Sequence, residues 1–161
     1  MKLVQYAIAA GAVVIVAACG ADNSNATKPK CDVDSTYQQV QQQIFEGRGC
    51  TASACHGEGA TGGLDLRAES SYAGLVIVEA NSGDYMLVFP GEQDLSLLYQ
   101  KFAAKTEGFE LGPLGISGGA MPTGEGQLSE DDLGLLRQWI RGGAPETGIV
   151  EGSDQYASCE L

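Results

Sequence analysis

The clearest alternation of apolar and polar positions lies in the segment LSEDDLGLLRQWIRGGA, residues 128–144. Its apolar positions recur every three or four residues, as on one face of a helix: Leu133, Leu136 and Ile140. Ser129 stands at the expected N-cap, and Asp132, three residues later, can complete a variant of the capping box. The pair Gly142-Gly143 is a typical helix stop. The segment therefore predicts an amphipathic helix.

A second helical pattern runs from Ser35 to Phe45. Its apolar stripe consists of Val33, Tyr37, Val40 and Ile44. Ser35 can cap the helix, with Gln38 as the third residue of a capping box, and Gly47 and Gly49 then end it.

Three weaker patterns lie between these two helices. Residues 69–80 predict a shorter helix or turn, with Tyr72, Leu75 and Val76 on one side. Residues 94–102 place apolar side chains at helical spacing, after the turn at Pro90-Gly91. The apolar positions there are Leu95, Leu98, Tyr99 and Phe102. Only residues 85–89 look extended. The pattern as a whole predicts a mainly α-helical domain.

Long glycine-rich stretches separate these helices, such as GEGATGG and GPLGISGGAMPTGEG. Such loops lose much conformational entropy on ordering and bring few side chains to bury. A large apolar ligand in the centre of the domain would give them something to order around.

The N-terminal residues have a different pattern. Lys2 precedes an apolar run from Leu3 to Ala18, which is short for a membrane span and fits a signal peptide better. The run ends in VAAC, which resembles the lipobox of bacterial lipoproteins and implies that Cys19 is lipidated. We therefore divide the chain into a signal peptide (1–18), a polar flexible tether (19–30) and a folded domain (31–161). A short membrane anchor and an ordinary cleavage site are the alternatives.

Composition narrows the range of partners. The 161 residues include 9 Lys and Arg against 21 Asp and Glu, a formal net charge of −12. Nucleic acid is excluded as a partner, because phosphate binding needs clustered basic residues. An acidic surface favours basic partners, although a need for solubility explains the same negative charge equally well.

Four cysteines follow Cys19. Cys31 and Cys159 bracket the domain, so a disulfide between them would close a loop of nearly its whole length. Two free thiols are the alternative. A secreted chain makes disulfides or covalent attachments the more common fate of cysteine.

The other two cysteines, Cys50 and Cys55, precede His56, the only histidine, which directly follows Cys55. Zinc would need a further ligand, blue copper a second histidine, and a Cys–His catalytic pair a different geometry. A Cys50–Cys55 disulfide is possible but leaves the histidine unexplained. Covalent haem attachment explains all three residues, since two thiols add to haem vinyl groups and the next histidine binds the iron. The usual C-x-x-C-H spacing is lengthened here by two residues, and residues 51–54 are small enough to loop out.

A haem iron in an electron carrier commonly takes methionine as its sixth ligand. Beyond the signal peptide the chain has Met86, in an apolar stretch that we interpret as core, and Met121. Met121 lies in the loop GGAMPTG, where packing gives little reason for a methionine. Pro122 fixes its own φ, so the loop can present the thioether to a ligand.

The order of these motifs resembles the small c-type cytochrome domains of planctomycete and myxobacterial envelope proteins. The matching segments, between residues 37 and 144, are C-x4-C-H, GGLDL, YAGL, PGEQDLSLLYQKF, MPTG and LSEDDLGLLRQWIRGGA. The resemblance implies a class I cytochrome c fold with long Gly-rich loops around a haem c. Cys50 and Cys55 would be the thioether sites, His56 the proximal ligand and Met121 the distal ligand. It also implies that Trp139 and Leu136 pack near the haem or the first helix.

We therefore expect a lipid-anchored, periplasm-facing monohaem cytochrome that carries single electrons and is not an enzyme. Its partners would be a redox protein with a basic docking surface and, through Cys19, a bacterial membrane. A haem-free, disulfide-stapled envelope lipoprotein that serves as an interaction module is the main alternative. A catalytic haem, such as a peroxidase, would need an open sixth position and a distal acid–base group.

Overall fold

The computed structural model describes residues 30–160. The predicted signal peptide (1–18), the lipidation site Cys19, the tether up to residue 29 and Leu161 lie outside the described residues. Every regular element in the described range is helical. In chain order the elements are α1 (Thr36–Val40), η1 (Gln41–Glu46), η2 (Thr61–Gly63), α2 (Ser71–Leu75), η3 (Gln93–Leu95), α3 (Leu97–Ala103), η4 (Ala104–Gly108), η5 (Gly112–Leu114) and α4 (Glu130–Arg141).

The longest helix, α4, begins as its sequence predicts. Ser129 Oγ accepts a hydrogen bond from the backbone N–H of Asp132 at 3.1 Å, and Asp132 Oδ2 accepts one from the N–H of Ser129 at 3.2 Å. This reciprocal pair confirms the capping box. The buried Asp132 carboxylate also pairs with Arg48 and accepts a hydrogen bond from Gln43 Nε2 at 2.9 Å. The cap of α4 is therefore tied to the end of the first helical segment.

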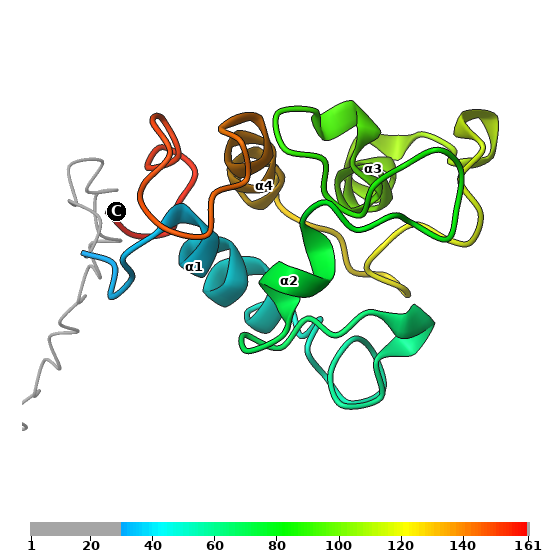
Figure 1. The fold of residues 1–161 in the computed structure, drawn as a ribbon, viewed down its shortest axis with the longest axis horizontal. Coiled ribbons are helices and arrows are strands. Elements are labelled where there is room, and N and C mark those ends of the chain that lie inside the picture. Colours follow the sequence, from blue (N-terminus) through cyan, green and yellow to red (C-terminus); the bar gives the residue numbers. More distant parts are fainter. Residues whose placement is uncertain (1–29, 161) are drawn as a thin grey trace, which may run out of the picture.

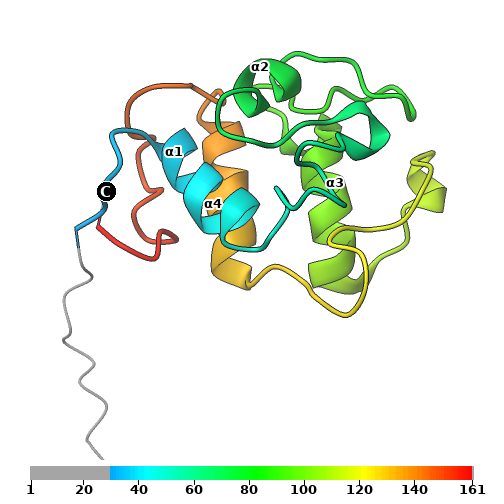
Figure 2. The same cartoon turned by 90° about the horizontal axis from the view of Figure 1, so that it is seen from below.

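Helix α4 lies between α1 and α3, as Figures 1 and 2 both show. The rings of Tyr37 on α1 and Trp139 on α4 lie 5.1 Å apart at an interplanar angle of 36°. Trp139 is fully buried, and its Nε1–H donates to the carbonyl of Pro145 at 2.9 Å. The expectation that Trp139 packs near the first helix is thus confirmed, and these three helices enclose the main core.

The first predicted helix keeps its length but changes its winding. After α1 the chain continues as a π-helix, η1, which ends at Glu46, one residue beyond the predicted end at Phe45. Ser35 caps α1, with its side chain accepting from the N–H of Gln38 at 3.1 Å. In η1 the buried Gln41 side chain donates to the carbonyl of Leu66 at 3.0 Å.

Two predictions for residues 85–102 are wrong: that Leu95 lies on the apolar face of the helix and that Met86 belongs to the core. Leu95 does not join the apolar face of α3 but is 44% exposed, because the buried Ser96 begins a new turn there. Ser96 Oγ accepts from the N–H of Phe89 at 2.9 Å and donates to the carbonyl of Glu92 at 2.8 Å. Residues 85–89 form only isolated bridges, and Met86 is half-buried and belongs to neither core cluster.

A disulfide joins Cys31 to Cys159 across a sequence separation of 128 residues. The N–H of Cys31 also donates to the carbonyl of Glu160 at 2.8 Å. Figure 2 shows the two ends of the described chain side by side at the face of the molecule formed by α1. The covalent bond therefore closes almost the whole domain into one loop.

Candidate functional site

The segment from Cys50 to Leu66 forms a loop held largely by its own backbone. The N–H of His56 donates to the carbonyl of Cys50 at 3.0 Å, which brings the ends of the C-x4-C-H motif together. The N–H of Cys55 donates to the carbonyl of Ala52 at 2.8 Å. Residues 52–54, in the spacer between the cysteines, are exposed, so the additional spacer length loops into solvent.

Gly57, directly after the histidine, is required by the tightness of this loop. Its N–H donates to the carbonyl of Ala52 at 3.1 Å. A Cβ atom at this buried position would stand 2.1 Å from the carbonyl oxygen of Thr51, closer than non-bonded atoms approach. Any side chain here would displace the turn that fixes His56.

The two cysteines of the motif are free thiols in different surroundings. Cys50 is buried, and its Sγ–H donates to the carbonyl of Ile44 at 3.6 Å. Burial raises the pKa of the Cys50 thiol to about 11, so it stays protonated at neutral pH. Cys55 is half-buried. The disulfide considered between these two residues is not formed.

The imidazole of His56 is oriented by a backbone carbonyl. Its Nδ1 lies 3.3 Å from the carbonyl oxygen of Leu64, and the N–H of Leu66 donates to the carbonyl of His56 at 2.6 Å. In the tautomer that donates from Nδ1, the lone pair is on Nε2, the arrangement typical of a metal-binding histidine. The loop thus orients the imidazole, with Nε2 as the nitrogen that would bind a metal.

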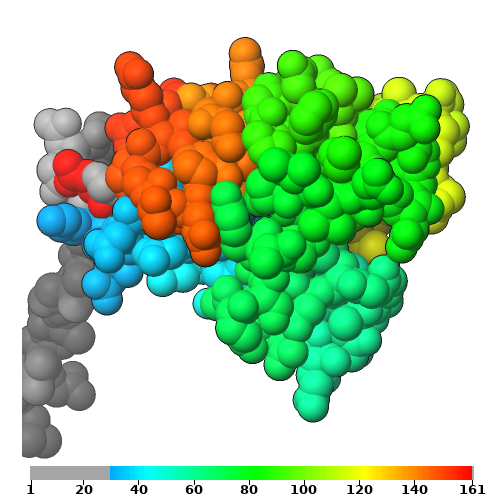
Figure 3. Space-filling model, viewed as in Figure 1, coloured from blue at the N-terminus to red at the C-terminus, as the bar shows by residue number. Residues whose placement is uncertain are grey.

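Met121, in the other half of the chain, packs against the main core. Its half-buried side chain packs against the main core cluster, which contains Cys50 and is also contacted by Leu64. The expectation that a methionine in this loop lacks a packing partner is therefore wrong. Figure 3 shows part of the yellow segment that includes residue 120 set back between the loop of residues 50–66 and the neighbouring green segment.

The donor set fits a c-type haem by its chemistry. It supplies two free thiols, an imidazole whose Nδ1 faces a carbonyl, and a thioether from a distant loop that packs on the main core. Between residues 30 and 160, no group of three His, Cys, Asp or Glu side chains lies close enough to hold a bare metal ion. This does not bear on a haem iron, which takes its four equatorial ligands from the porphyrin.

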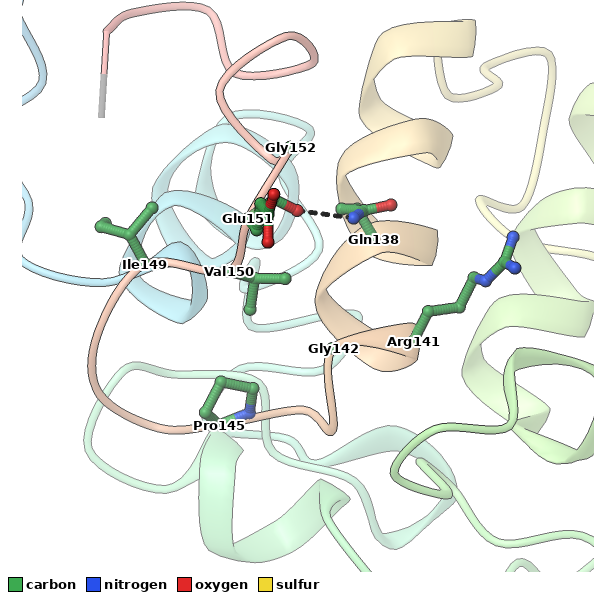
Figure 4. A pocket seen from close by; sticks show the side chains of 8 residues that line it. All are labelled: Gln138, Arg141, Gly142, Pro145, Ile149, Val150, Glu151 and Gly152. Carbon is green, nitrogen blue, oxygen red and sulfur yellow. Dashed lines mark hydrogen bonds between the residues drawn. The ribbon is translucent and has the colours of Figure 1, made fainter.

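Two surface cavities lie away from this site. The larger, of about 800 Å³, opens at the C-terminal end of α4, where Gln138 Nε2 donates to the carbonyl of Glu151 at 2.7 Å (Figure 4). Its lining residues are Gln138, Arg141, Gly142, Pro145, Ile149, Val150, Glu151 and Gly152. The smaller, of about 350 Å³, lies between η4 and α4. Neither contains a cysteine, histidine or methionine, so we place the candidate site at the C-x4-C-H loop.

Sequence reasoning missed the groups that support the site. The carbonyl of Leu64 faces His56, and Lys101 on α3 contacts the loop that carries Met121. The one available signal was the placement of Lys101 and Lys105 four residues apart on one helical segment, beside a predicted ligand loop. A carbonyl partner gives no signal in a sequence.

Comparison with protein-family models, with curated proteins and with solved structures finds no match to this chain. In the described part of the chain, no helix has the length and apolar character needed to cross a membrane.

Proposed function

We propose that this chain is a monohaem c-type cytochrome that carries single electrons at the cell envelope and has a class I cytochrome c fold. The observation that carries the proposal is the contrast between two pairs of cysteines. Cys31 and Cys159 form a disulfide, whereas Cys50 and Cys55 stay free in the loop that orients His56. Two unpaired thiols beside the only histidine are available to form another covalent bond.

The proposed thioether bonds form by a simple addition that needs no oxidant. Each S–H adds across one vinyl group of the haem, so that the sulfur joins one carbon and the hydrogen the other. Cys50 and Cys55 would hold the group covalently, and His56 Nε2 and Met121 Sδ would be its iron ligands. Haem c supplies one-electron exchange at its iron. The protein contributes orientation of the histidine, a thioether that raises the potential, and apolar packing around Cys50.

Serine at both motif cysteines tests the attachment. We expect the Cys50→Ser, Cys55→Ser double variant to lose covalent haem completely, because no other described cysteine is free to react. Each single variant should retain one thioether and show an altered haemochrome spectrum. The matched control is the Cys31→Ser, Cys159→Ser pair, which should keep its haem. Retention of covalent haem by the motif double variant would refute the assignment.

The haem-free lipoprotein module is the alternative from another class. It uses the motif cysteines as a second disulfide, and the free state of both thiols argues against it. A catalytic haem would need a vacant sixth position. We assign that position to Met121, whose half-buried side chain packs against the main core.

The partner that we propose is a redox protein with a basic docking surface, because the chain has a net charge of −12. We expect oxidation by a cationic cobalt(III) complex to slow about tenfold between roughly 0.01 M and 0.5 M salt, as the Debye length shrinks from about 30 Å to a few Å. Oxidation by anionic ferricyanide is the control and should speed up. Stopped-flow rates that do not change with salt for either probe would contradict the partner assignment.

We also propose that lipid on Cys19 holds the protein at a bacterial membrane, on its periplasmic or outer-surface side. The support is the VAAC sequence at residues 16–19. Each methylene group of a lipid chain that is buried in the bilayer contributes about 0.8 kcal/mol to the free energy of membrane binding. The polar residues that follow would then separate the electron-transfer domain from the membrane surface.

A further inference from the structure

The loop that carries Met121 has little structure of its own. Residues 115–128 connect η5 to α4 without a helical turn, and Gly115, Gly118 and Gly124 have positive φ. Such a segment has many accessible conformations, so a ligand placed on it is presented poorly unless the loop is held. The contacts that hold it come mainly from α3 and η4.

Lys101 contacts this loop at three points within five residues. Its Nζ donates to the carbonyl of Ser117 at 2.6 Å and to the carbonyl of Gly119 at 3.0 Å. Its own backbone carbonyl accepts the N–H of Met121 at 2.9 Å. Lys101 therefore binds both the residues just before the methionine and the backbone of the methionine itself.

Further contacts restrain the loop before and after Met121. The N–H of Ser117 donates to Ser82 Oγ at 2.6 Å. Beyond the methionine, Lys105, one helical turn after Lys101, donates from Nζ to the carbonyl of Gly124. Met121 thus lies between two anchored carbonyls, those of Gly119 and Gly124.

The close approach of the Lys101 ammonium depends on a glycine. Gly118 has φ +74°, a conformation that side chains rarely adopt, and a Cβ there would lie 3.3 Å from Lys101 Nζ. The loop bends its carbonyls around the ammonium at this point. Hydrogen bonds from a charged donor are worth about twice as much as neutral ones, so two of them form a firm anchor.

We propose that Lys101 is the positioning residue for Met121, holding the loop so that the thioether stays directed at the site occupied by the iron. The inference rests on the proposed function, because it takes Met121 Sδ as an axial ligand. Lys101 does not touch the haem in this account. Its two side-chain hydrogen bonds set the fraction of time for which Met121 is in place.

The test measures how readily imidazole displaces the methionine from the ferric holoprotein. We expect Lys101→Leu, which keeps an aliphatic stem but lacks the ammonium, to bind imidazole about tenfold more tightly. Both hydrogen bonds of the ammonium are lost in this variant, and because both are exposed we expect their combined effect to be this tenfold change, which corresponds to about 1.4 kcal/mol. The absorption band of the thioether–iron(III) bond should weaken in parallel. Lys101→Arg, which keeps donors for both carbonyls, should restore both readings to within about threefold of wild type.

Lys30→Leu is the matched control, because Lys30 lies at the other end of the domain beside Glu160, and its imidazole affinity should equal that of wild type. Met121→Ala, which lacks the thioether, sets the upper limit of the imidazole affinity. If Met121→Ala opens the site and Lys101→Leu behaves as wild type, the positioning role is wrong while the proposed function stands. If Met121→Ala itself changes nothing, the methionine is not a ligand and the positioning role fails with it, while retention of the haem bands after acid–acetone extraction shows separately whether the chain is a c-type cytochrome. A lowered unfolding free energy without a change in imidazole affinity would also overturn the positioning role.

Discussion

Replacing Met121 with alanine will convert a closed site into one that binds added ligands. We expect the reduced Met121→Ala holoprotein to bind carbon monoxide about a hundredfold more tightly than wild type. With the proposed methionine ligand in place, an external ligand would enter only in the fraction of wild-type molecules whose methionine has dissociated, and minor states of this kind are populated at about 1%. The reduction potential should fall as well, because thioether ligation raises it.

Met86→Ala is the matched control for this prediction. Met86 is also half-buried, but it lies outside both core clusters, so its removal should leave the affinity for carbon monoxide unchanged. Spectroscopic titration of the two variants and wild type separates the two methionines. Equal, tight binding by wild type and Met121→Ala would show that the sixth position is already open, as a catalytic haem requires.

Removing the disulfide between Cys31 and Cys159 will have the largest effect on stability. The bond closes a loop spanning 128 residues, and for a loop of this size the chain-entropy account predicts a loss of about 4–5 kcal/mol in the free energy of unfolding. We expect this loss in the Cys31→Ser, Cys159→Ser variant, measured as a lower urea midpoint.

Reduction supplies the control for the disulfide prediction. A thiol reductant should lower the stability of wild type to that of the double variant and leave the double variant unchanged. The haem spectrum should be the same in both proteins, because the pair lies near the chain ends and outside the proposed site. A loss below about 1 kcal/mol would mean that the backbone contact between Cys31 and Glu160 already holds the ends together.

The parts of the fold that follow from the sequence are those set by local contacts. Ser129 and Asp132 are three residues apart, so their reciprocal bonds are visible in the pattern of α4. Leu95 shows the limit of this reasoning. Its spacing fits α3, but the buried Ser96 side chain binds Phe89 and Glu92 and starts the helix two residues later. Periodicity contains no information about such a contact.

In the candidate site, too, the local motif can be predicted from the sequence and the long-range contacts cannot. The C-x4-C-H motif identifies Cys50, Cys55 and His56 because their spacing is itself the signal. The support of Met121 is hidden, because the Lys101 ammonium reaches carbonyls 16 and 18 residues further along the chain. Backbone acceptors have no identity in a sequence. A long-range hydrogen bond to one of them becomes visible only in the folded chain.

Covalent haem is the central claim, and acid–acetone extraction of the wild-type chain, produced with a c-type maturation system, tests it most directly. The denatured protein is then examined by its reduced-minus-oxidised visible spectrum. Our account predicts that the haem bands stay with the protein after extraction, since two thioether bonds at Cys50 and Cys55 survive the loss of axial ligands. Protein without haem, alongside a known c-type cytochrome that retains its own under the same conditions, would contradict the account.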